Sequence, residues 1–77
     1  MSTFIEVPVV AGDEEETEVR TQLINIDCIG RVFSSPQNSR RSIIELNYHS
    51  INDAPVFLEV EQSYDSVRQA ILNALKA

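Results

Sequence analysis

The hydrophobic pattern changes its period once, near the C-terminal end of the chain. Between residues 55 and 61 apolar and polar residues alternate, with Val56, Leu58 and Val60 on one face, as in a half-buried strand. After a two-residue break, the apolar residues recur every three or four positions, which is the period of an amphipathic helix. The pattern therefore predicts a strand that leads directly into a docked helix.

Both ends of the predicted helix, residues 64–77, carry the expected end signals. Ser63 is a preferred N-cap residue, because its hydroxyl can accept a hydrogen bond from a free backbone N–H of the first turn. Asp65 in the first turn and Lys76 in the last complement the helix dipole. The apolar stripe consists of Tyr64, Val67, Ala70, Ile71, Ala74 and Leu75. We interpret this stripe as a core-packing face rather than a groove for a partner.

Alternation predicts further strands at residues 3–10, 18–24, 31–33 and 41–48. The first two read as a hairpin, with residues 11–17 at its tip. Pro8 cannot donate to a ladder, so the first strand should lie at a sheet edge, or its pairing should stop there. Asn25 is a good cap, and Ile26 and Ile29 are three residues apart, which predicts a helical turn or 3₁₀ corner.

These elements predict a single domain, residues 1–77, of the α+β class: a small, curved antiparallel meander of about five strands with one C-terminal helix. Residues 34–40 and 49–54 are expected to be loops. One contiguous core is expected between the sheet and the helix. Its predicted members are Ile44, Leu46, Leu58, Val60, Val67 and Ile71.

Four large apolar residues, Phe4, Ile24, Ile43 and Phe57, fall on the face directed away from the helix, if Leu23 lies on the core face. Either the sheet rolls into a partial barrel or the assumed register is off by one residue. Alternatively, the four residues form a surface for self-association or for a partner. We favour this alternative, with Phe57 as the anchor of the contact.

The chain length adds weight to self-association. At 77 residues, a single core is marginal without a metal, disulfides or oligomerisation. One cysteine excludes an internal disulfide, and no Cys/His cluster has zinc-ligand spacing. We therefore expect a homodimer. The first residues show no signal-peptide pattern, and no apolar run approaches the ~20 residues of a membrane span, so we expect a soluble, cytoplasmic protein.

The charge distribution argues against direct binding of nucleic acid. The formal net charge is −6, and Asp13, Glu14, Glu15 and Glu16 form a consecutive acidic run. Nucleic-acid binders usually carry a basic face instead. Calcium loops alternate their ligands around a glycine, whereas consecutive acids diverge, so we interpret the run as a solvated loop.

No arrangement of residues suggests catalysis or a cofactor. Cys28 lies beside Asp27 with no nearby cation to stabilise a thiolate, which favours a structural role. His49 could pair with Asp53 across their loop, but no nucleophile is placed for it to activate. The pair Arg40 and Arg41 lacks the glycines that let backbone N–H groups hold a phosphate. We therefore expect neither an enzyme nor a cofactor or metal protein.

The hydrophobic spacing over residues 19–72 resembles that of small bacterial and phage proteins of the flagellar FlbD type. The segments that carry the resemblance are Leu23-Ile-Asn25, Ile29-Gly-Arg-Val32, Ile44-Glu-Leu46 and Leu58-Glu-Val60, with the capping Ser63. This chain departs from the pattern at its acidic tip and at the loops 34–40 and 49–54. The resemblance implies a small accessory module and brings no catalytic residues.

Two functions of different classes remain as hypotheses. The first is a non-catalytic interaction module, a homodimer that docks on a larger intracellular protein through an exposed edge or its second apolar face. The second is an acidic, phage-type regulator whose residues 13–18 imitate nucleic-acid charge and occupy a basic groove on the target. Binding by the mimic should weaken steeply with salt, whereas apolar docking should not.

Overall fold

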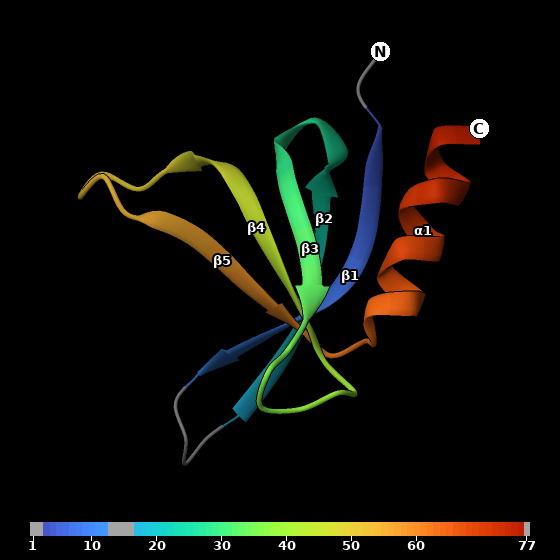
Figure 1. Cartoon of the computed structure of the whole chain (residues 1–77), viewed down its shortest axis with the longest axis horizontal. Helices are drawn as coiled ribbons and strands as arrows, with labels where there is room; N and C mark the ends of the chain where they lie inside the picture. Colours follow the sequence, from blue (N-terminus) through green and yellow to red (C-terminus); the bar gives the residue numbers. More distant parts are fainter. Residues whose placement is uncertain (1–2, 13–16, 77) are drawn as a thin grey trace.

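The protein folds as one antiparallel sheet with a single helix packed against it, in a computed structural model that describes residues 3–12 and 17–76. Within these residues the strands are β1 (Phe4–Gly12), β2 (Thr17–Asn25), β3 (Ile29–Ser34), β4 (Ser42–His49) and β5 (Pro55–Val60). The 3₁₀ turn η1 (Ile26–Cys28) joins β2 to β3, and the helix α1 (Tyr64–Lys76) ends the described chain. Figure 1 labels the strands, whose order in the sheet is β2-β1-β5-β4-β3. The α+β class and the predicted element order are confirmed.

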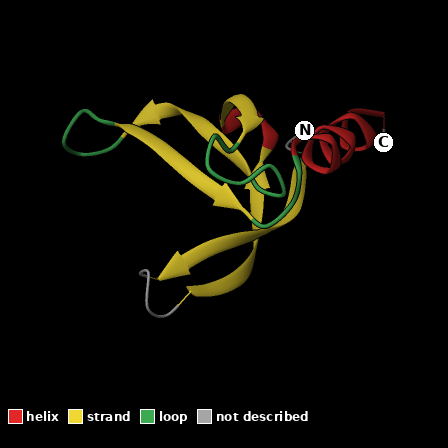
Figure 2. Cartoon of the chain, turned by 60° about the horizontal axis from the view of Figure 1, so that its bottom comes forward, coloured by secondary structure: helices red, strands yellow, loops and turns green. Residues whose placement is uncertain are grey.

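The sheet consists of two parts that meet at a narrow junction. β1 and β2 pair over nine consecutive positions, from Phe4 opposite Asn25 to Gly12 opposite Thr17. β1 and β5, by contrast, share only the pair Val9 and Val60. From this junction the β1–β2 hairpin and the β4–β5 hairpin diverge (Figure 2). The β1–β2 hairpin is therefore attached to the rest of the sheet over a short length only.

Pro8 lies in an interior strand, so of the two predicted alternatives the edge strand is wrong, and the end of the pairing at Pro8 is the one observed. β1 lies between β2 and β5, and the C=O of Pro8 accepts a hydrogen bond of 2.8 Å from the N–H of Glu61. The C=O and N of one strand residue point to the same side, so the missing N–H of Pro8 also faces the β5 side. The missing N–H of Pro8 therefore removes no hydrogen bond between β1 and β2. Proline is tolerated at this position because the pairing of β1 with β5 ends here.

The core lies between the concave side of the sheet and α1. Its buried members are Ile5, Val7, Val9, Ile24, Ile44, Leu46, Val60 and Val67, and Leu58 and Ile71 are partly buried against them. α1 packs on β1, β3 and β4. The six predicted core residues thus belong to one contiguous cluster, as expected.

The predicted caps are present. The hydroxyl of Ser63 accepts a hydrogen bond from the N–H of Ser66 at 3.3 Å, and its C=O accepts one from Val67 at 3.1 Å. This is the N-cap arrangement that satisfies a free donor of the first helical turn. The side chain of Asn25 likewise accepts a 3.0 Å bond from the N–H of Asp27, which confirms the predicted corner.

The predicted faces of β2 are wrong by one residue. Ile24 is only 9% exposed, whereas Leu23 is 65% exposed. Ile24 lies directly opposite the buried Ile5, and Leu23 lies opposite Glu6. Residues directly opposite in a pair share a face of the sheet, so the pairing with β1 turns Ile24 into the core. Ile24 therefore cannot belong to an outward surface.

Candidate interaction surface on the β1–β2 hairpin

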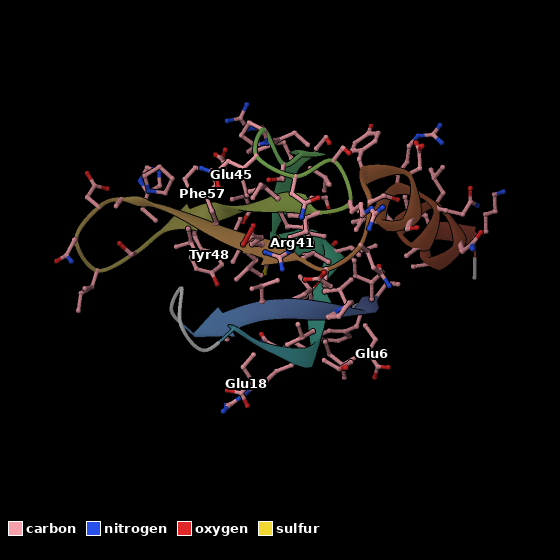
Figure 3. The ribbon with its side chains drawn as sticks, turned by 90° about the horizontal axis from the view of Figure 1, so that it is seen from below. Glu6, Glu18, Arg41, Glu45, Tyr48 and Phe57 are labelled. Carbon is pink, nitrogen blue, oxygen red and sulfur yellow. The ribbon has the colours of Figure 1, made fainter. Side chains whose placement is uncertain are left out.

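The remaining predicted interaction residues do not form one surface. Phe4 is 51% and Phe57 is 48% exposed, and Ile43 is half-buried. Figure 3 shows Phe57 and Glu45 on one side of the β4–β5 pair, and Glu6 beyond β1 on the opposite side of the molecule. Alternation places Phe4 on the same face of β1 as Glu6. The predicted single surface is therefore wrong, because Phe4 and Phe57 face in opposite directions.

Phe4 belongs instead to an apolar surface on the outward side of the hairpin. Val10 lies opposite Val19, and Pro8 lies opposite Thr21. We call the set Phe4, Pro8, Val10, Val19 and Leu23 the hairpin face. Phe4 is 51%, Val19 is 45% and Leu23 is 65% exposed, whereas large apolar side chains normally cluster in the core. Sequence reasoning placed Leu23 on the wrong face and passed over Val10 and Val19.

Among residues 3–12 and 17–76, nothing covers either face of β2 over most of its length. All residues from Glu18 to Leu23 are exposed, although they alternate between the two faces. In the described part of the chain, β1 is the only strand or helix that packs extensively on β2. β2 is also the last strand at its end of the sheet. The strand therefore offers solvent both faces and one edge.

Within the part of the chain that the structure describes, the backbone groups along this edge form no hydrogen bond. Residues of an antiparallel pair alternate between pairs that exchange hydrogen bonds and pairs that do not. The polar groups of Pro8 point to β5, so Pro8 and Thr21 form a pair without hydrogen bonds. The N–H and C=O of Thr21 consequently point away from β1, and alternation gives the same direction to Val19 and Leu23. We call these outward backbone groups the free edge.

The free edge lacks the usual protection against pairing. Natural edge strands are often short, or interrupted by proline, lysine or a bulge. β2 has nine residues, contains neither proline nor lysine, and pairs with β1 without a register shift. Its two charged residues, Glu18 and Arg20, form an exposed ion pair with each other at 3.1 Å. The strand is thus well suited to accept another strand.

The outer surface of β3–β5 has a different character, because most of its charged groups already have partners. Nε of Arg31 lies 2.6 Å from Oε1 of Glu45, and its guanidinium stacks 4.9 Å from the ring centre of Phe33. Arg41 forms ion pairs with Glu59 at 3.6 Å and with Glu61 at 2.8 Å. The two carboxylates beside Arg41 also oppose binding of an anion there.

The other candidate residues show no arrangement for catalysis. Nδ1 of His49 lies 3.0 Å from Oδ1 of Asp53, which confirms the predicted pair, and both side chains are exposed. Cys28 is half-buried against the core, in agreement with a structural role. Among the described residues, no three His, Cys, Asp or Glu side chains are grouped so that they could hold a metal ion. The acidic residues Asp13, Glu14, Glu15 and Glu16 lie outside the described residues.

No helix among residues 3–12 and 17–76 is long and apolar enough to cross a membrane. Comparisons of the chain with protein-family models, with curated proteins and with solved structures returned no match. The resemblance to the flagellar FlbD type therefore stays a prediction, and the functional argument depends on the geometry of the hairpin.

Proposed function

We propose that this chain is a small, non-catalytic protein-interaction module that docks on a larger cytoplasmic protein through the hairpin face. The observation that carries the proposal is the exposure of Phe4, Val19 and Leu23 on one side of a two-stranded ribbon. Contiguous exposed apolar surface commonly marks a protein–protein contact. A cytoplasmic setting suits the single Cys28, because thiols stay reduced there.

The partner should present an apolar patch with basic residues around it. Glu6 is the charged residue that β1 contributes to the outward side of the hairpin, and the whole chain carries a net charge of −6. Complementary charge at the rim of an interface mainly raises the association rate and excludes wrong partners. Affinity would come from burial of Phe4 and its apolar neighbours.

A matched pair of variants tests this proposal. Phe4→Asp places a charge on the hairpin face, and Phe57→Asp places the same charge at a similarly exposed phenylalanine on the opposite side of the molecule. We expect proteins captured from the host extract by the wild type to be retained by Phe57→Asp and to bind Phe4→Asp at least about tenfold more weakly. Circular dichroism should show that both variants are folded.

Two results would contradict the proposal. Equal capture by the wild type and Phe4→Asp would show that the hairpin face is not the docking surface, and selective loss with Phe57→Asp would assign docking to the outer surface of β3–β5. A salt titration of the captured complex addresses the acidic-regulator alternative, because binding that depends on charge imitation falls steeply with salt. Apolar docking should change little.

A further inference from the structure

We infer that the free edge of β2 pairs with the same edge of a second copy of this chain, antiparallel about a twofold axis at Thr21. This inference goes beyond docking on a larger protein, because the backbone groups at the edge of β2 make the contact, and Val19 and Leu23 are the residues that it shares with the hairpin face. Twofold contacts are the commonest symmetry of soluble oligomers. Strand addition at an uncovered edge is a recurrent mode of association.

The pairing of β1 with β2 already directs the backbone groups that such a dimer needs toward the open edge. Thr21 forms a pair without hydrogen bonds with Pro8, so its N–H and C=O point to the open side. Placed on a twofold axis, Thr21 of each copy would donate to and accept from Thr21 of the other. The N–H and C=O groups of Val19 and Leu23 point in the same direction, so they would extend the ladder of hydrogen bonds on both sides of Thr21. The edge thus has a self-complementary set of donors and acceptors.

The side chains favour the register centred on Thr21. Thr21 is the middle residue of Thr17–Asn25, so this register pairs the whole strand with its copy. Val19 then lies opposite Leu23 of the second copy, which brings together two side chains that are exposed in the single chain. Apolar pairs directly opposite each other stabilise a sheet. A register centred on Val19 or on Leu23 would pair only five residues of the strand.

Charge also permits this arrangement, although each copy carries a net charge of −6. In the register centred on Thr21, Arg20 lies opposite Gln22 of the second copy, and Glu18 lies opposite Ile24. No like charges face each other along the described strand. The antiparallel direction also places the Gly12 and Thr17 ends of the two hairpins, next to the acidic run in the sequence, at opposite ends of the contact.

Sedimentation of two Thr21 variants provides the first test. Thr21→Pro removes an N–H that points to the open edge, so it should leave the bonds between β1 and β2 intact. We expect the wild type to form a dimer. The dissociation constant of the Thr21→Pro dimer should be at least about tenfold higher. Thr21→Val keeps the N–H and the branched side chain, so it should behave like the wild type. Thermal unfolding checks that Thr21→Pro is folded.

Cysteine cross-linking tests the register itself, in a Cys28→Ala background that removes the native thiol. Thr21→Cys should form a disulfide-linked dimer, because Cα atoms of a hydrogen-bonded antiparallel pair are about 5.5 Å apart, within disulfide range. Val19→Cys alone should not cross-link efficiently, because residue 19 of one copy lies opposite residue 23 of the other, four positions away from residue 19 of that strand. A mixture of Val19→Cys and Leu23→Cys should cross-link between the two proteins.

Four results would overturn this inference. The wild type could sediment as a monomer at about 1 mM, Thr21→Pro could remain folded and dimeric, or Val19→Cys alone could cross-link as well as Thr21→Cys. Monomers produced by Phe57→Asp would likewise move the contact to the outer surface of β3–β5. The first three outcomes leave the comparison of Phe4→Asp with the wild type unaffected, because Phe4 lies on β1 and not on the free edge.

Discussion

At the scale of single residues, the sequence predicts local hydrogen bonds well and tertiary partners poorly. The cap of Ser63, the cap of Asn25 and the pair His49 and Asp53 join residues no more than four positions apart. Their geometry follows from the local turn, so the residue types suffice to predict them. The ion pairs of Arg41 with Glu59 and Glu61 depend on how β4 and β5 align, which no local pattern specifies.

The alternation along β4 places Ser42 on the core face, but it does not predict what burial of its hydroxyl costs in stability. Its side chain is fully buried on the core face of β4, and its hydroxyl lacks a hydrogen-bond partner among the described residues. An unsatisfied buried hydroxyl costs about 1–3 kcal/mol. We therefore expect Ser42→Ala to raise the free energy of unfolding by about 1 kcal/mol in urea denaturation.

Ser35→Ala is the matched control for that experiment. Ser35 is also buried, but its hydroxyl accepts a 3.4 Å hydrogen bond from the N–H of Gln37. Its removal leaves a donor without its partner, so Ser35→Ala should lower stability by about 0.5–1.5 kcal/mol. A loss of stability in both variants would show that Ser42 has a hydrogen bond in solution.

At the scale of elements, periodicity predicts where strands and helices lie but not always which face is buried. The helix was expected at residues 64–77 and is described at Tyr64–Lys76. β2, in contrast, has a large apolar residue on each face near its end, Leu23 and Ile24. The alternation is then compatible with either register, and a shift of one residue exchanges the faces. The pairing of Ile24 with Ile5 decides between them.

Adjacent alanine substitutions in β2 test this register. Ile24 is buried in the core and Leu23 is 65% exposed, so Ile24→Ala should cost about 2–5 kcal/mol of stability. Leu23→Ala should change stability by no more than about 0.5 kcal/mol. Urea denaturation of dilute protein, where association contributes little, gives both values. Equal losses for the two variants would contradict the assignment of the faces.

At the scale of the whole molecule, the sequence predicts the antiparallel sheet and its helix, but not the order that separates β2 from β3 or the junction that divides the sheet. The pair Val9 and Val60 joins the first and last strands, and such long-range pairing has no signature in local periodicity. With this narrow junction, no described residue covers the outward side of the β1–β2 hairpin or its edge. The hairpin face and the free edge are consequences of topology, which explains why sequence reasoning assigned the outward residues to a single face.

Net charge is the whole-molecule property that should oppose the self-pairing of β2. Replacement of Asp13, Glu14, Glu15 and Glu16 by serine would change the formal net charge from −6 to −2. Because like-charged copies repel one another, we expect the serine variant to dimerise more tightly than the wild type in low salt. Added salt should strengthen the wild-type dimer by screening and should affect the variant less. Stability should change by no more than about 1 kcal/mol. If the variant instead stays folded but loses its captured protein partner, the acidic run itself makes the contact, and the charge-mimicking regulator becomes the better hypothesis.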